Sequence, residues 1–235
     1  MTTNSDWASE TEQALLDGAL RLAPGIGWSW RLVRSAGREL GLSEAEVELL
    51  LPQGPGDLAA LYGARLDAKA LAALAPLDPA TLKIRERIRA GALAWLDAAR
   101  THEAASRRWS GFLALAPHTP LGLRLAWTSA DVLWRWAGDV ATDENHYTKR
   151  GLLAGILIST LAVALASGRG AAERFLDRRI DGVMAFERWK RSLAKPGDLA
   201  TRISGALGAL RHGRAPAPAE PWTDAPARPG FPTPP

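Results

Sequence analysis

Cysteine is absent from this chain of 235 residues, which excludes both a disulfide framework and a thiolate metal site. The absence is compatible with a reducing compartment. The opening stretch MTTNSDWASE also lacks the basic region and the apolar run of a secretory signal. We therefore expect a cytoplasmic protein.

Patterns that support catalysis are missing too. The four histidines stand singly, and the sequence has no His-Glu-x-x-His motif, no paired Glu-x-x-His motif and no glycine-rich loop after a strand. We therefore expect no enzymatic activity, no metal ion and no cofactor.

Period-two alternation with β-branched residues is lacking as well, whereas apolar residues recur at helical spacing between breakers. A helical domain of this length buries roughly 70% of the surface that its unfolded chain exposes. We predict an all-α protein with helices over about 9–22, from 29, after Ser43, and over 57–74, 79–99, 103–115, 120–136, 144–167, 172–192 and 198–210.

Two of these segments carry clear core stripes. The first helix should stop before Pro24 and bury one face, formed by Leu15, Leu16, Ala19 and Leu22. The helix that begins at Pro79 should bury a stripe formed by Ile84, Ile88, Ala92 and Trp95. In the second helix, Trp30, Val33 and Leu40 are the apolar positions.

The opening three helices have the layout of a TetR-type repressor head, in which the second and third form a helix-turn-helix. A recognition helix needs basic and amide side chains for phosphates and base edges. Here Glu44, Glu46 and Glu48 would repel phosphates, and Ser43 with Glu46 forms a capping box. We therefore expect no nucleic acid partner, with a ligand-responsive transcriptional regulator as the alternative function.

The segment 120–136 is rich in tryptophan, and Leu123, Trp127, Ala130 and Trp134 form one apolar stripe along it. Polar residues form only a narrow line along this segment, which predicts a helix that other parts of the protein cover on most sides. Periodicity leaves two interpretations open, because indole rings either pack as a solid core or form the wall of a cavity for an apolar ligand.

The run 151–167 is uncharged and begins with a Gly151-x-x-x-Gly155 pair. Its 17 residues lie at the lower limit for crossing a bilayer, and no aromatic belt flanks it. We predict a buried helix rather than a membrane span. Its small residues Gly155, Ser159 and Ala162 leave room for a neighbouring helix or a ligand.

Basic residues concentrate near the end of the chain, where 187–214 holds seven Lys or Arg against Glu187 and Asp198. The last predicted helix there has the pattern of an interfacial helix, although docking on its own domain is the alternative. We predict membrane-binding residues at Leu199, Arg202, Ile203, Leu207, Leu210 and Arg211. The last 21 residues hold eight prolines and should be disordered.

The stretch DVLWRWAGDVATDENHYTKRGLLAGI, residues 131–156, resembles the accessory lipid-binding protein family of ubiquinone (coenzyme Q) biosynthesis. The resemblance continues through LGLS at 40–43, GPGDL at 54–58 and the helix around 175–189, and covers most of residues 10–195. It implies a TetR-like helical bundle that has lost DNA binding, a homodimer, a cavity for isoprenoid lipid and a C-terminal amphipathic helix. It favours the cavity-wall interpretation of the tryptophan-rich helix.

This resemblance also suggests roles for individual residues. A bound isoprenoid or phospholipid is expected, with a lipid-binding set of Leu123, Trp127, Ala130, Trp134, Ile156, Ser159 and Thr160. The family's surface patch for the di-iron demethoxyubiquinone hydroxylase corresponds to Asp131, Trp134, Asp143, His146, Tyr147 and Arg150. His146 departs from the tryptophan that many members have there.

The resulting hypothesis is a non-catalytic accessory protein of ubiquinone biosynthesis. It would associate peripherally with the inner membrane, take up an isoprenoid quinone intermediate and present it to the hydroxylase. The predicted domains are a flexible N-terminus (1–8), a trihelical head (9–52), a lipid-binding and dimerisation body (53–195), a membrane-contacting helix (196–213) and a proline-rich tail (214–235).

Overall fold

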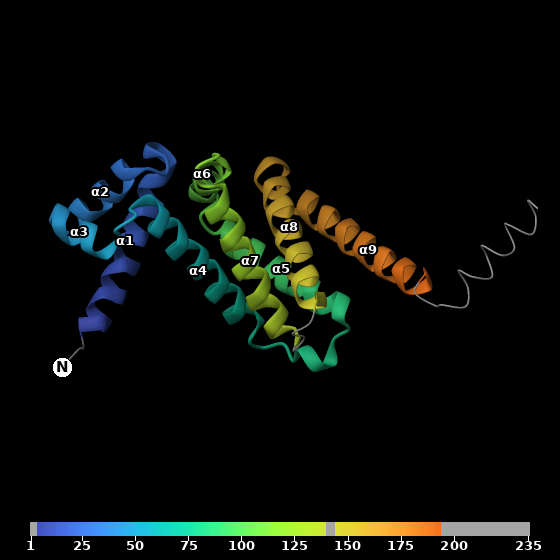
Figure 1. The fold of residues 1–235 in the computed structure, drawn as a ribbon. Helices are drawn as coiled ribbons and strands as arrows, with labels where there is room; N and C mark the ends of the chain where they lie inside the picture. Colours follow the sequence, from blue (N-terminus) through green and yellow to red (C-terminus); the bar gives the residue numbers. More distant parts are fainter. Residues whose placement is uncertain (1–3, 140–143, 194–235) are drawn as a thin grey trace, which may run out of the picture. The chain divides into compact units, whose positions relative to one another are not determined.

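A computed structural model describes residues 4–139 and 144–193 of the chain. Throughout these ranges the regular structure is helical, which confirms the all-α prediction, while the TetR-like arrangement stays a prediction. The helices in chain order (Figure 1) are α1 (Asn4–Ile26), α2 (Trp30–Glu39), α3 (Glu44–Leu50), α4 (Pro55–Leu74), the 3-10 turn η1 (Pro79–Thr81), α5 (Ile84–Arg100), α6 (Glu103–Ala114), α7 (Thr119–Trp136), α8 (Glu144–Ser167) and α9 (Arg169–Leu193).

The chain divides into two compact units, Met1–Met184 and Ala185–Pro235. The first unit contains the predicted head and nearly all of the predicted body. In the second unit, only the end of α9 is described. The predicted membrane-contacting helix and the proline-rich tail lie outside the described residues.

The first unit begins with α1 packed against α2. Leu15, Leu16 and Ala19 of α1 are completely buried, as their spacing predicts. Of the apolar residues assigned to this helix, Val33 is buried, whereas Trp30 at the first position of the helix and Leu40 just after its end are exposed. Both lie at the ends of a ten-residue helix, beyond the central turns that α1 covers.

Pro24 corrects the predicted end of α1. The helix continues through this proline to Ile26, and Gly27 then takes a φ of +81°. Because Pro24 lies within the last turn, its missing N–H removes a single helical hydrogen bond. The Gly27 N–H still bonds the Ala23 carbonyl at 2.9 Å, and Arg108 of α6 donates to the Pro24 carbonyl.

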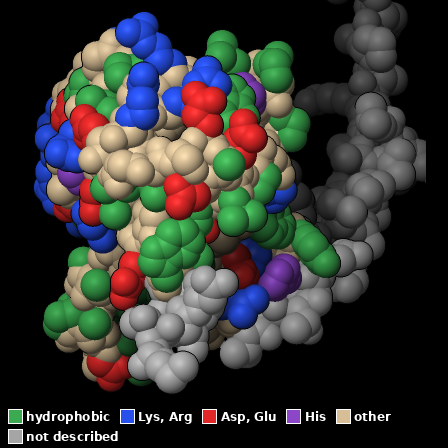
Figure 2. Space-filling view, turned by 90° about the vertical axis from the view of Figure 1, so that its left-hand side faces the viewer, with side chains coloured by type: hydrophobic (Ala, Val, Ile, Leu, Met, Phe, Trp, Pro, Cys, Tyr) green, Lys and Arg blue, Asp and Glu red, His purple; other side chains and the backbone are tan. Residues whose placement is uncertain are grey.

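Helix α3 is short and acidic, as the sequence indicates. Ser43 caps it, since the Ser43 Oγ accepts from the Glu46 N–H while the Glu46 carboxylate accepts from the Ser43 N–H. Glu44, Glu46 and Glu48 are all exposed. Figure 2 shows acidic and basic side chains interspersed on the face that includes the head, rather than a broad surface of one sign. This arrangement is unlike a phosphate-binding surface.

The centre of the first unit is formed by α4, α5, α7 and α8. Helix α7 lies between α4 and α8 and contacts both, while α5 packs on α4 and also meets α8 (Figure 1). Ile88, Ala92 and Trp95 are buried as predicted, but Ile84 is exposed. The correction has a local cause, because the helix starts at Ile84 rather than at Pro79, whose short turn η1 precedes it.

Helix α8 buries one long side and leaves another side open. Leu153, Leu157, Leu161 and Ala164 are buried, whereas Leu152 and Ile158 are exposed. Among the described residues, one segment, His146–Ser167 of α8, is long and apolar enough to cross a membrane by length and composition. Its contacts with α5 and α7 fit the predicted packed helix.

Helix α9 is tied to α5 by a row of charged pairs. Ala172, Leu176 and Ile180 of α9 are buried. Arg89 pairs with Asp177 at 2.7 Å, and Arg85 pairs with Asp181 at the same distance. Since both basic and both acidic residues are four apart, the two helices are held in one register.

Candidate functional site

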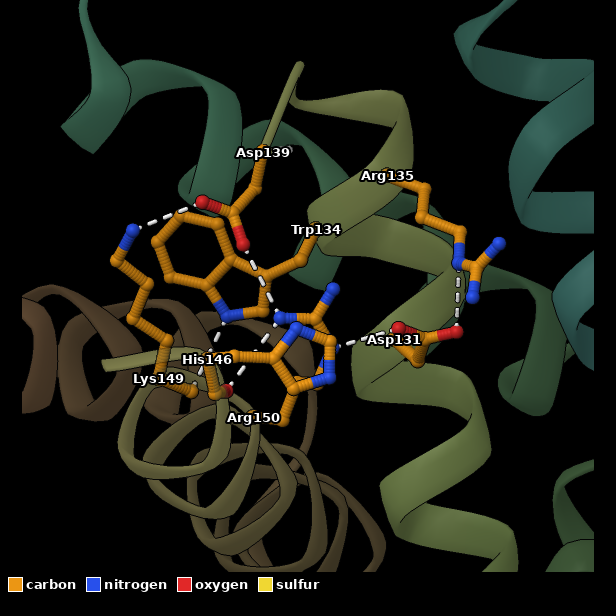
Figure 3. A network of polar contacts seen from close by, with 7 residues as sticks. All are labelled: Asp131, Trp134, Arg135, Asp139, His146, Lys149 and Arg150. Atoms are coloured by element: carbon orange, nitrogen blue, oxygen red, sulfur yellow. Dashed lines mark hydrogen bonds and ion pairs between the residues drawn. The ribbon is translucent and has the colours of Figure 1, made fainter. Parts of the chain in front are cut away.

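A network of charged side chains joins the end of α7 to the start of α8 (Figure 3). The Arg150 Nε donates to Asp131 Oδ1 at 2.6 Å, and one of its terminal nitrogens donates to Asp139 Oδ2 at 3.0 Å. Lys149 binds the other Asp139 oxygen at 2.8 Å, and Arg135 binds the other Asp131 oxygen at 2.7 Å. Two carboxylates therefore lie between three cations.

This network is more buried than an ordinary surface ion pair. The Arg150 side chain is 2% exposed and that of Asp139 is 7% exposed. Burial alone raises the pKa of Asp139, but hydrogen bonds from Lys149 and Arg150 outweigh it and leave the pKa lowered. In the same way, burial raises the pKa of Asp131 while Arg150 and Arg135 lower it more. Both carboxylates are thus ionised near neutral pH.

The turn after α7 places Asp139 in the network. Gly138 has a φ of +86°, its N–H bonds the Arg135 carbonyl, and the Asp139 N–H bonds the Trp134 carbonyl at 3.0 Å. This pair of bonds is the Schellman motif that ends many helices and favours glycine at the left-handed position. The sequence Ala137-Gly138-Asp139 therefore ends α7 and turns a carboxylate back toward α8.

Trp134 adds an uncharged link between the two helices. Its indole is largely buried, and Nε1 donates to the Lys149 carbonyl at 3.1 Å. The Lys149 ammonium lies 5.4 Å from the centre of the same ring. Trp134 and Arg150, both predicted to bind a partner, therefore hold the α7–α8 corner together from inside and contact little solvent.

The exposed part of the predicted partner patch is aromatic. Tyr147 is 66% exposed, and its ring centre lies 6.0 Å from that of Trp127 and 5.2 Å from that of His146. Asp131 is partly exposed beside them. Asp143, the remaining member of the predicted set, lies outside the described residues. The partner-binding role of the set stays a prediction.

An apolar cavity of about 500 Å³ lies along the same helices, further from the network. Helix α7 contributes Leu125, Ala126 and Ser129, and α8 contributes Leu157, Ile158, Leu161 and Ala162. Trp95 of α5 and several residues of α6, including Trp109 and Leu113, complete the wall. This volume is within the roughly 300–1,000 Å³ typical of pockets that bind small molecules.

The cavity reaches the surface beside exposed apolar side chains. Leu123 and Ile158 both line it, yet they are 58% and 45% exposed. Exposed residues of this size beside a hollow apolar wall are typical of a binding site rather than of an ordinary solvated surface.

The predicted lipid-binding residues are distributed unevenly around this cavity. Leu123 lies on its wall, whereas the other six lie elsewhere. Trp127 lies beside Tyr147, and Trp134 belongs to the network. The remaining residues are on α7 and α8: Ala130, Ile156 and Thr160 are buried, and the Ser159 hydroxyl donates to the Gly155 carbonyl. No ligand identifies the residues that contact lipid, so their role stays a prediction. The membrane-binding set, from Leu199 to Arg211, lies outside the described residues.

Several wall residues were missed by the sequence analysis. Leu157 and Leu161 each follow a predicted residue by one position, and Ser129 precedes one. A shift of one residue turns a helical side chain by about 100°, so the residues that line the cavity are neighbours of the predicted ones on the same helices. Asp139 and Lys149 of the network lie within the stretch 131–156, and this was the signal that could have identified them.

Among the described residues, no group of three or more His, Asp or Glu side chains lies close enough together to hold a metal ion. The charged network contains two carboxylates, but both are already paired with Lys or Arg side chains.

Comparison with known families identifies the part of the chain that carries both the charged network and much of the cavity wall. Residues 119–187 match the COQ9 family. The matched range spans α7, α8 and much of α9, and therefore includes the whole charged network and ten of the sixteen residues of the cavity wall. It confirms the resemblance to the ubiquinone biosynthesis accessory family that residues 131–156 predict.

Individual relatives extend the COQ9 similarity over most of the chain. The ubiquinone biosynthesis protein COQ9 of Xenopus tropicalis, a mitochondrial protein, is 25% identical over 217 residues, or 85% of this chain and 65% of the relative. COQ9-B of Xenopus laevis is 26% identical over 88% of this chain and 73% of the relative, and human COQ9 is 25% identical over 87% and 67%. The chain thus spans about two thirds of the length of these relatives.

Proposed function

We propose that this chain is a non-catalytic accessory protein of ubiquinone biosynthesis that binds an isoprenoid quinone intermediate and presents it to a di-iron hydroxylase. The observation that carries the proposal is the apolar cavity, because the helices that match the COQ9 family form most of its wall. The names of the relatives supply the pathway, and the cavity supplies a chemical reason for an accessory protein to act in it.

An isoprenoid chain suits this cavity in composition and access. The wall is formed mainly by leucine, alanine and the rings of two tryptophans, which gain free energy by covering hydrocarbon. Transfer from a bilayer exchanges one apolar environment for another, so access determines the outcome more than affinity does. The exposed Leu123 and Ile158 give the chain an apolar route from the surface.

Presentation to a partner fits the arrangement of α7 and α8. The same two helices carry the cavity wall and the charged network, and Arg150 precedes the wall residue Leu157 by seven residues, or about 10 Å of helix. The exposed Tyr147 and the partly exposed Asp131 lie at the network end. A hydroxylase docked there would lie within reach of a head group that emerges from the cavity.

The membrane, the oligomeric state and the location belong to the same proposal. The amphipathic segment 196–213 would bring the protein to the cytoplasmic side of the inner membrane, and the chain would act as a homodimer. These parts are supported by the sequence of that segment and by the resemblance.

The first experiment is mass spectrometry of the lipids that copurify under native conditions from a ubiquinone-making host. A matched pair of variants, Ala162→Phe and Ala166→Phe, adds the same bulk one turn apart on exposed positions of α8, and only residue 162 lies on the cavity wall. We expect near-stoichiometric isoprenoid or quinone with the wild type and with Ala166→Phe, and a loss of more than half of it with Ala162→Phe.

Two results would contradict the proposal. An empty wild-type protein after gentle purification would argue against lipid carriage. Equal lipid content in the Ala162→Phe and Ala166→Phe proteins would show that the lipid binds outside this cavity.

A further inference from the structure

The polar groups in the cavity wall are oriented in an unusual way. Five residues of the wall have a polar side-chain atom: Trp95, Trp109, Ser110, Thr119 and Ser129. A binding site for an oxygen-containing group normally directs a few such atoms at its ligand. Here the hydrogen bonds that these polar groups make go to other parts of the protein rather than into the cavity.

Three of the five polar groups are unavailable to a ligand for reasons within the fold. The Trp109 Nε1 donates to the Ala59 carbonyl of α4 at 3.1 Å, and the Thr119 hydroxyl donates to the Leu115 carbonyl at 3.2 Å. The Ser110 Oγ is itself buried, without a hydrogen-bond partner in the described part of the chain. The Trp109 and Thr119 donors are therefore committed within the fold, whereas the Ser110 hydroxyl is unpartnered and its oxygen is buried rather than exposed in the cavity.

Asp67 of α4 accounts for the other two. The Trp95 Nε1 donates to Asp67 Oδ1 at 3.0 Å, and the Ser129 hydroxyl lies near enough to the same carboxyl group to lower its pKa. Asp67 is 8% exposed, and it does not line the cavity itself. It therefore lies behind the wall and joins α4 to α5 and α7.

We propose that Asp67 sets the ligand specificity of this cavity, by drawing the polar hydrogens of Trp95 and Ser129 away from it so that the cavity accepts hydrocarbon and discriminates against oxygen-containing groups. This inference rests on the proposed function, because it concerns the same cavity. It implies that the isoprenoid tail occupies the cavity and that the oxygen-bearing head group stays outside.

The burial of Asp67 shows that this arrangement is costly. Its pKa is raised to about 6 by burial, although the hydrogen bonds from Ser129 and Trp95 act in the opposite direction. A leucine at this position would remove that cost, but it would also remove the interactions by which Asp67 joins α4 to α5 and α7. We explain the buried carboxyl group of Asp67 by its effect on the cavity. It accepts the hydrogens of two donors in the wall, and the surface that faces the cavity is therefore apolar.

The experiment compares the binding of n-decane and 1-decanol, which differ by one hydroxyl group, through their displacement of a bound naphthalene probe from the full chain. In Asp67→Leu, the Ser129 hydroxyl loses its acceptor and becomes free to bond the alcohol. We expect the ratio of the 1-decanol Kd to the n-decane Kd to fall at least tenfold relative to the wild type. Asp67→Asn keeps an acceptor oxygen and should keep the ratio within threefold.

Two further variants identify the donor and control for folding. Asp67→Leu combined with Ser129→Ala should return the ratio toward the wild-type value, because the released hydroxyl is gone. Asp57→Leu makes the same substitution on α4 but away from this cavity, and should leave the ratio unchanged. Circular dichroism checks that each variant folds, and Asp67→Ala replaces Asp67→Leu if that protein does not.

The outcomes separate the inference from the proposed function. If the wild type binds decane and a folded Asp67→Leu protein shows the wild-type ratio, the specificity role of Asp67 is wrong and lipid binding stands. If the wild type binds neither compound nor isoprenoid, the proposed function fails, and the inference fails with it.

Discussion

Arg150 on α8 and Asp139 after α7 form an ion pair of 3.0 Å in which both side chains are almost fully buried. A second carboxylate, that of Asp131, completes the surroundings of the same guanidinium at 2.6 Å. The planar guanidinium has its donors at fixed angles, which suits two acceptors on different sides. This pair fixes the corner between two helices that also form much of the cavity wall.

The first prediction concerns removal of that guanidinium. Arg150→Ala leaves two largely buried carboxylates without their shared partner, and should lower the free energy of unfolding by about 3–5 kcal/mol. Arg135→Ala removes another partner of Asp131, but Arg135 is 72% exposed, so its loss should be about 1 kcal/mol or less. Urea denaturation measures both. Similar losses in the two variants would show that burial does not strengthen the network.

The second prediction is a pH dependence that comes from Asp67. Its pKa is about 6 in the folded chain against 3.8 for an ordinary aspartate, so between these values the folded state binds more protons than the unfolded state. Stability from this group is therefore present below about pH 4 and is lost as the pH rises through 6. The loss is on the order of 2–3 kcal/mol.

Asp67→Asn isolates this contribution, because an amide does not titrate. The difference in unfolding free energy between variant and wild type should move in favour of the variant from pH 4 to pH 6 and then level off. The variant has to be compared with the wild type because Asp131, Asp139 and Asp177 have lowered pKa values. The stability that these three groups contribute to the folded chain is lost as the pH falls. A flat difference across this range would contradict the prediction.

The third prediction concerns Gly138, whose φ of +86° shapes the turn that positions Asp139. Gly138→Ala strains this left-handed position and should cost about 1–2 kcal/mol of stability. Gly155→Ala lies in α8 with open space around the added carbon and should be neutral or stabilising by up to about 1 kcal/mol. Thermal unfolding of the two proteins tests the contrast, which a stabilising Gly138→Ala substitution would refute.

The fourth prediction separates partner binding from stability. Tyr147 is exposed, so Tyr147→Ala should leave the unfolding midpoint nearly unchanged while weakening capture of the hydroxylase at least fivefold. Arg124→Ala changes an exposed residue of α7 outside the aromatic cluster and should leave capture unchanged. Surface plasmon resonance with purified hydroxylase measures both, and undiminished binding by Tyr147→Ala would remove this residue from the interface.

The sequence by itself determined the helical class and most helix positions, since apolar periodicity and capping are local properties. The acidic α3, the buried stripe of α1 and the cap at Ser43 follow directly from neighbouring residues. The stretch 131–156 likewise pointed to the COQ9 match. Local reasoning failed at Pro24 and at Ile84, where a proline near a helix end was tolerated and a helix began later than its pattern suggested.

Only the tertiary structure decided which side of each helix faces which neighbour. The sequence gives no direct measure of the angle between α7 and α8, and the cavity is lined by Leu157 rather than by its neighbour Ile156, which the sequence analysis assigned to lipid binding. Asp67 carries no motif, and its role depends on Trp95 and Ser129, which lie 28 and 62 residues away along the chain. Contacts of this kind arise from the packing of three helices, so no window of sequence contains them.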